Sequence, residues 1–383
     1  MAVSTPALQT TTFTPPAWLR SRNWDLTFVS LSVVLVAIPY LSYLGLTRLD
    51  PLLGPIAAQF GTSVDSLSRN IINAAVALLI GGPHMYATFS RTALDADYRH
   101  KHPRVVWTSL AIPVVVISLA VFNLQLLLTV FFFWASVHVL HQIVYITEMY
   151  NHKGKLQSSV PQTSWSKAAD YAVILTALYP LAAYKMAIGE FRIGLNNVGE
   201  TVGVVLGTVG LPLGMWMVWV SGGLFAMALL AWVVKTVLQW RQGTIHWPKT
   251  LFLSLTVVAS FFVPALGNLD TAFQGMNLWH SLQYLALTWM LNNLRQKRGE
   301  LDSKPFLKRI SQDGSARQYY LFNVGLTVAD VLLAVVFFMV MRFVFNTTFD
   351  FAFDRAYYMA ILSFLWIHYY HDHFLFTEPE AIG

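Results

Sequence analysis

The chain has 383 residues, of which 56% are hydrophobic and only 11% are charged, and its mean hydropathy is +0.53. Soluble domains carry about 25% charged residues, so this composition excludes an ordinary soluble protein. The chain has no cysteine, which excludes disulfides, iron–sulfur clusters and thiolate-bound metals. The net charge of +6 comes mostly from basic loops, as in membrane proteins, and we predict no nucleic-acid partner.

Apolar runs of about 20 residues, each long enough to cross a bilayer, recur along the chain. They predict an all-α, polytopic membrane bundle of about ten transmembrane helices, within a range of about 8–11. Residues 1–25 are expected to form an N-terminal tail, 26–377 a single transmembrane domain, and 378–383 a C-terminal tail. The expected spans cover 27–48, 70–90, 105–122, 124–148, 169–188, 212–238, 250–266, 276–294, 321–344 and 357–376.

Clusters of Lys and Arg orient the predicted spans. Basic residues are dense in the loops at 91–104, 153–167 and 295–309. Cytoplasmic loops carry an excess of positive charge, so we place these three loops and both termini in the cytoplasm. The Gly-rich, weakly apolar segment 190–210 is expected to be an external loop or a re-entrant segment.

Three histidines and an aspartate interrupt the last apolar run. In a helix, His368, His371 and Asp372 are spaced i, i+3 and i+4 and share one face, while His373 points about a third of a turn aside. A polar side chain in lipid is costly unless it has a partner. Two imidazoles and a carboxylate from one helical turn therefore resemble half of a metal site.

Further histidines lie in other spans at a similar predicted depth. A lone intramembrane histidine is more often a helix–helix hydrogen bond than a ligand. Agreement in depth among four spans, with His138 and His141 repeating the i, i+3 spacing, instead favours shared metal ligation. The predicted ligands are His84, His138, His141, His280, His368, His371 and His373. The other four, at positions 100, 102, 152 and 246, are expected to be ordinary loop residues.

Polar side chains near these histidines complete the predicted site. Asp372 and Glu148, which shares a helix face with His141, are the candidate catalytic carboxylates that bridge or tune the metal. Asp330, in the ninth span, either supports a ligating histidine or makes a buried hydrogen bond to a neighbouring helix. Gln142 and Gln283 are expected to support the ligands from behind.

Imidazole together with carboxylate suits iron, zinc, copper or manganese. The number of candidate ligands exceeds one tetrahedral zinc site, and it fits either two metal ions or one ion with further supporting groups around it.

The histidine spacing resembles a known class of membrane enzyme. The stretches His138-Val-Leu-His141-Gln142 and His368-Tyr-Tyr-His371-Asp372 are similar to the H-x-x-H-H boxes of integral-membrane non-haem di-iron oxygenases: fatty-acid desaturases, hydroxylases and alkane monooxygenases. Here Gln or Asp stands in place of the last histidine, and the histidines lie within spans rather than in cytoplasmic segments.

Two shorter stretches, Gly82-Pro83-His84 and Trp279-His280-Ser281, look like motifs of the Brp/Blh carotenoid-cleaving membrane enzymes. Both resemblances imply an iron- and O2-dependent oxidoreductase that acts on a lipophilic substrate drawn from the membrane lipid, by desaturation, hydroxylation or oxidative cleavage. The resemblance to the di-iron oxygenases implies two Fe ions, and zinc, copper and haem remain the alternatives. The chain shows no flavin or nicotinamide motif, so an external electron donor is expected.

Two other functions fit parts of the pattern. In a haem-binding electron-transfer protein, histidines on two facing helices supply axial ligands, although i, i+3 pairs on one helix suit haem poorly. In a metal or ion transporter, intramembrane His and Asp line an ion path, usually together with internal repeats, and no repeat is visible here.

Overall fold

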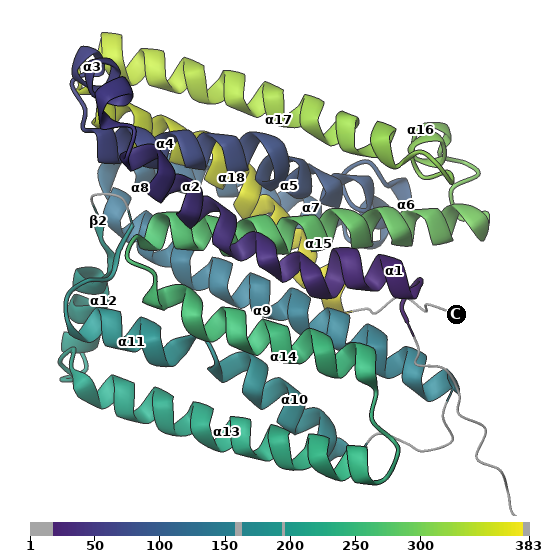
Figure 1. Cartoon of the computed structure of the whole chain (residues 1–383). Helices are drawn as coiled ribbons and strands as arrows, with labels where there is room; N and C mark the ends of the chain where they lie inside the picture. Colours follow the sequence, from purple (N-terminus) through teal and green to yellow (C-terminus); the bar gives the residue numbers. More distant parts are fainter. Residues whose placement is uncertain (1–17, 158–162, 194–195, 378–383) are drawn as a thin grey trace, which may run out of the picture.

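The computed structural model describes residues 18–157, 163–193 and 196–377, and these are almost entirely helical (Figure 1). The all-α prediction is confirmed. The strands found in the described ranges are β1 (Arg192–Ile193) and β2 (Asn196–Asn197), which pair antiparallel. The expected tail at 378–383 lies outside the described residues, whereas the expected N-terminal tail overlaps α1 (Arg22–Trp24).

Within the described residues, seven helical stretches are long and apolar enough to cross a membrane, which identifies an integral membrane protein. Their elements are α1, η1 (Asp25–Ser30), η2 (Leu31–Ala37) and α2 (Ile38–Thr47); α4 (Val64–Val76), η3 (Ala77–Gly81), α5 (Gly82–Ala87) and η4 (Thr88–Ser90); α7 (Pro103–Ser109) and α8 (Ile112–Phe122); α9 (Leu124–Gln157); α13 (Met215–Arg241); α14 (Trp247–Phe262) and η5 (Val263–Ala265); α17 (Ala316–Met339) and η6 (Val340–Val344).

The expected count of about ten spans is not confirmed, because three of the expected spans do not form helices that are both long and apolar enough. The helices α15 (Leu269–Lys297) and α18 (Phe349–Thr377) have 29 residues each, but they carry the polar residues of the core and are less apolar. The fifth expected span is broken into α10 (Ser164–Thr176) and α11 (Tyr179–Ala187), and Pro180 opens the second piece. Short helices fill the connections: α3 (Asp50–Phe60), α6 (Ala96–Lys101), α12 (Val198–Gly207) and α16 (Pro305–Ile310).

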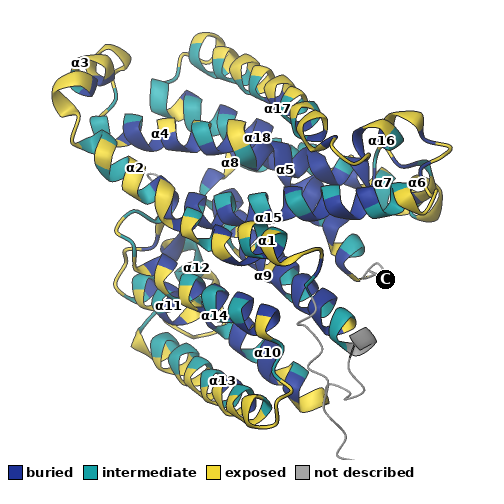
Figure 2. Ribbon diagram, turned by 45° about the vertical axis from the view of Figure 1, so that its right-hand side comes forward, coloured by how far each residue is buried: buried dark blue, intermediate teal, exposed yellow. Residues whose placement is uncertain are grey.

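The core lies where α5, α9, α15 and α18 pass one another, and the outer helices are mostly exposed on their far sides (Figure 2). Within its most apolar stretch, the span Val64–Ser90 is 67% buried, compared with 11% for both α13 and Ala316–Val344. Exposed apolar side chains on the outer helices suit contact with lipid. The polar groups are therefore concentrated on the central helices.

Two of the predicted cytoplasmic loops meet at one end of the bundle, where α1 begins and α18 ends (Figure 1). Lys304 donates to Asp95 and to Asp97, and Arg295 donates to Asp95 over 2.6 Å. Burial alone would raise the pKa of the Asp95 carboxyl, but hydrogen bonds from Lys304 and Arg295 outweigh it and hold the pKa below its usual value. The loops at 91–104 and 295–309 thus form one surface.

Gly275 marks the closest approach of α15 to the first span. A Cβ atom at this position would lie 2.0 Å from the Val36 carbonyl oxygen, so Gly275→Ala must push η2 and α15 apart. We expect a loss of about 1–3 kcal/mol, seen as a lower Tm of the detergent-solubilised protein. Gly325→Ala on α17, where a Cβ meets nothing within 4 Å, is the matched control. Equal Tm values for the two variants would contradict the close approach.

Candidate metal centre

Four buried histidines from four central helices meet at one place in the bundle. His84 lies on α5, His138 on α9, His280 on α15 and His368 on α18. One ligand nitrogen from each lies within 4.8 Å of the other three, and the residues are 0–4% exposed. Imidazole nitrogens converging at this spacing can hold a transition-metal ion. Among the residues that the structure describes, this is the one such group of three or more ligand side chains.

The four rings form a closed arrangement in which each ring meets two neighbours edge to face. The centroid distances are 5.1 Å between His84 and His280, and 4.9 Å between His280 and His138. They are 4.8 Å between His138 and His368, and 4.5 Å between His368 and His84. Rings in this arrangement do not stack, so nitrogen-bearing edges from four helices can approach a common point.

Each ring carries a buried nitrogen without a hydrogen-bond partner. These are Nε2 of His84, His138 and His368, and both nitrogens of His280. In two rings the opposite nitrogen is fixed: Nδ1 of His84 lies 2.5 Å from the Gly81 carbonyl oxygen, and Nδ1 of His368 lies 2.5 Å from the Thr88 hydroxyl. A hydrogen bond at Nδ1 orients the ring so that Nε2 faces a metal. A bound cation would satisfy the lone pairs of these nitrogens, whose isolation costs about 1–3 kcal/mol each.

A carboxylate and two hydroxyl groups lie directly beside the four rings. Asp372 Oδ1 accepts hydrogen bonds from the Tyr284 hydroxyl over 2.6 Å and from Thr88 over 3.0 Å. Its Oδ2 has no hydrogen-bond partner and lies 3.5 Å from His368 Nδ1 and 4.0 Å from His138 Nε2. The carboxylate is 0% exposed, so it belongs to the same buried polar cluster as the histidines.

Local backbone features place His84 in this cluster. The π-helical turn η3 precedes it, and such turns are frequent at functional sites because they re-aim the residues that follow. A Cβ at Gly82 would lie 2.1 Å from the Thr327 side chain, so the glycine allows α5 to pack tightly on α17. The Ser281 hydroxyl lies 2.9 Å from His84 Nδ1 and gives the ring a second contact.

The two predicted glutamines, Gln142 and Gln283, hydrogen-bond to each other and to backbone carbonyl groups near the histidines. Gln142 donates to the His280 carbonyl oxygen over 3.2 Å and to the Gln283 side chain over 3.3 Å. Gln283 in turn donates to the Val29 carbonyl oxygen over 2.6 Å. They therefore tie α9, α15 and the first span together and make no hydrogen bond to the imidazole rings.

The other predicted histidine ligands lie outside the four-histidine group. His371 contacts the Tyr98 hydroxyl at 3.0 Å and Ser109 at 3.3 Å. His141 instead faces the exposed His373, with ring centroids 5.6 Å apart. His371, His141 and His373 therefore lie beside the four-histidine group rather than within it.

The two remaining acids also lie elsewhere. Glu148 accepts hydrogen bonds from Lys167 over 2.9 Å, from Asn151 over 2.8 Å and from Tyr171. It is ten residues beyond His138 on α9, or ~15 Å along the helix. Asp330 is buried on α17 next to Tyr86. The structure thus brings Asp372, and neither Glu148 nor Asp330, to the four rings.

Thr88 and Tyr284 are site residues that the sequence analysis did not single out. Each lies four residues after a histidine of the group, Thr88 after His84 and Tyr284 after His280. Residues at i and i+4 share a helix face, so this spacing was a usable signal.

Comparison with known proteins adds no family to these observations: no family model matches the chain, and no curated protein or solved structure matches it significantly.

Proposed function

We propose that this protein is a membrane-embedded, non-haem iron oxidoreductase that uses O2 to oxidise a lipophilic substrate. The observation that carries the proposal is the convergence of four buried imidazoles, with unpartnered nitrogens, beside the Asp372 carboxylate. Imidazole suits iron, and a set of four nitrogens leaves positions open on an octahedral ion. Iron bound here would supply the activation of O2. Desaturation, hydroxylation and oxidative cleavage all fall within this chemistry.

We propose one iron in place of the two expected from the sequence. Metal–imidazole bonds of about 2.0–2.1 Å put opposite ligand atoms about 4 Å apart, and the four nitrogens lie within 4.8 Å of one another. Glu148, which was expected to bridge or tune the metal, instead accepts hydrogen bonds from Lys167 and Asn151. The geometry therefore favours a single ion held by the four histidines.

The protein's own side chains would orient the ligands and control protons. Thr88 fixes the ring of His368, and Tyr284 and Thr88 together hold the Asp372 carboxylate against it. The Tyr284 hydroxyl keeps an exchangeable proton hydrogen-bonded to Asp372 Oδ1. Burial of the whole cluster keeps water away from a reactive centre.

The proposal includes the orientation of the protein. The joined loops at 91–104 and 295–309, together with both termini, would face the cytoplasm. A cavity of about 280 Å³ opens at this surface, and its lining includes both basic residues, among them Arg91 and Lys101, and acidic residues, among them Asp97. An external electron donor would dock at this end of the bundle.

The geometry favours this function over the two alternatives. Ring centroids only 4.5–5.1 Å apart leave no room between the imidazoles for a porphyrin macrocycle. An ion path needs ligands that exchange with water, whereas these four residues are 0–4% exposed.

Metal analysis tests the proposed function directly. Protein purified in detergent and loaded anaerobically with Fe²⁺ is expected to retain about one iron per chain after desalting, because four nitrogens converge on one point. Nitric oxide should then give the paramagnetic resonance signal of a high-spin non-haem iron with an open position. Absence of stoichiometric metal, or a Soret band, would overturn the proposal, and two irons per chain would overturn the single-ion assignment.

A further inference from the structure

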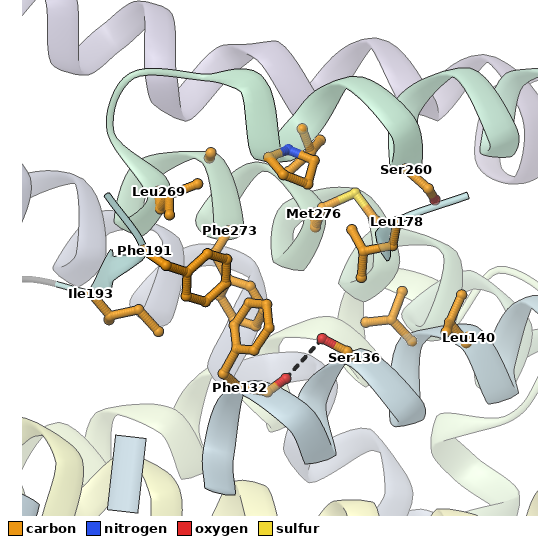
Figure 3. A pocket seen from close by; sticks show the side chains of 14 residues that line it. Phe132, Ser136, Leu140, Leu178, Phe191, Ile193, Ser260, Leu269, Phe273 and Met276 are labelled. Carbon is orange, nitrogen blue, oxygen red and sulfur yellow. Dashed lines mark hydrogen bonds between the residues drawn. The ribbon is translucent and has the colours of Figure 1, made fainter. Parts of the chain in front are cut away.

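A second cavity, almost entirely apolar, lies between α9, α14, η5 and α15, and Leu178, Phe191 and Ile193 complete its lining (Figure 3). Its volume is about 50 Å³, and three aromatic rings, from Phe132, Phe191 and Phe273, crowd one side of it. The centroids of Phe132 and Phe191 are 4.7 Å apart. No lining side chain is charged, and only two, Ser136 and Ser260, carry a polar group.

This cavity shares two helices with the four-histidine group. Met276 lines the cavity and lies one turn before His280 on α15, so the two residues share a helix face about 6 Å apart along the axis. Val139, also in the lining, directly follows His138 on α9. Leu269, at the far end, precedes His280 by eleven residues, or ~16 Å. The cavity thus begins about one turn from the proposed metal ligands.

Its two hydroxyl groups differ in what they can offer a ligand. Ser136 already donates to the Phe132 carbonyl oxygen over 2.8 Å (Figure 3). The Ser260 residue is 1% exposed, and its Oγ has no hydrogen-bond partner. An isolated buried hydroxyl costs about 1–3 kcal/mol, which a ligand oxygen would recover. Ser260 is therefore the single polar anchor that the cavity presents.

We propose that this cavity holds the uncharged, oxygen-bearing end of the lipophilic substrate, with one substrate oxygen hydrogen-bonded to Ser260 Oγ. The interpretation as a substrate site rests on the proposed function. The matching end groups are those of an alcohol, aldehyde, ketone or ester. An ionised carboxylate or a phosphate would be buried without a counter-charge, so such head groups do not fit.

The size of the cavity sets how much of the substrate it can hold. A volume of about 50 Å³ has room for roughly four water molecules, which corresponds to an end group and not to a whole lipid. The rest of the chain would pass Met276 toward His280. The bond that reacts would then lie inside the substrate chain, several carbons from the end that is held.

Photoaffinity labelling of the detergent-solubilised protein tests this site. The probe is hexadecan-1-ol with a diazirine near its hydroxyl end, and we expect it to label cavity residues such as Phe273 and Met276. Unlabelled hexadecan-1-ol should compete better than hexadecane, and hexadecanoate at about pH 8, where it is ionised, should compete least. Ser260→Ala should weaken competition by the alcohol about three- to tenfold and leave that by hexadecane unchanged.

Two further variants make the result decisive. Ala272→Phe fills the cavity and should abolish the labelling, whereas Val258→Phe, at a 57% exposed position on α14, adds the same ring toward lipid and should not. Labelling that is unaffected by both Ala272→Phe and Ser260→Ala overturns the proposal, and Ser260→Ala keeps the test valid if the larger variant fails to fold.

His280→Ala separates this proposal from the proposed function. It removes a metal ligand but no cavity residue, so labelling should persist in it. Cavity labelling together with the absence of stoichiometric metal in the unmodified protein would overturn the proposed function alone. Metal binding without Ser260-dependent competition would overturn the cavity proposal alone.

Discussion

Replacing His280 by Ala is expected to remove the bound metal from the purified protein. His280 is 3% exposed, and neither of its ring nitrogens has a hydrogen-bond partner, so metal ligation is the one role that its surroundings offer. Loss of one ligand or of its supporting group typically lowers metal affinity about 10–100-fold. Iron per chain, measured by elemental analysis after dialysis against a mild chelator, should therefore fall from about one to near zero. The same result is expected for His84, His138 and His368.

The matched control for this experiment is His141→Ala. His141 lies three residues after His138 on the same helix, but its ring faces His373 outside the four-histidine group. The iron content of the His141→Ala protein should remain that of the unmodified protein. If His141→Ala lost as much iron as His280→Ala, the ligand set would extend beyond the four converging histidines, and the assignment of a single ion would be wrong.

The sequence predicted the helices well where one physical signal dominated. Unbroken apolar runs located the lipid-facing helices, and α13 is one continuous helix that covers most of the expected span 212–238. The prediction was less successful where contacts between helices determine the local structure. The break before Tyr179 and the buried ion cluster of Lys235 and Lys249 with Asp170 depend on neighbouring helices.

The candidate site was predicted as a region, but not as a set of ligands. Spacing of i, i+3 puts two histidines on roughly one face, yet they differ by ~60° in direction and by ~4.5 Å in depth. His138 reaches the common point and His141 does not, and likewise His368 reaches it and His371 does not. Which one does so depends on the positions of α5 and α15, and no periodicity within a single helix contains that information.

Asp372→Asn is expected to leave iron bound but to slow its reaction with O2 about 10–100-fold, the usual effect of changing a group that supports a metal ligand. Asparagine keeps the shape of the side chain, and its oxygen can still accept the hydrogen bonds from Tyr284 and Thr88. The charge near His368 and His138 is lost, and an NH2 group replaces the unpartnered Oδ2. Stopped-flow oxidation of the iron-loaded protein measures the rate, and elemental analysis measures the metal.

Tyr284→Phe is the companion variant, because it removes one hydrogen bond to Asp372 and keeps the aromatic ring. It should also retain iron and change the rate in the same direction, by a smaller factor, since Thr88 still holds Oδ1 over 3.0 Å. Complete loss of iron in Asp372→Asn would make the carboxylate a direct ligand, through the oxygen that lies 3.5 Å from His368 Nδ1. A fully metallated and fully reactive Asp372→Asn protein would remove Asp372 from the chemistry, and the four histidines alone would have to account for it.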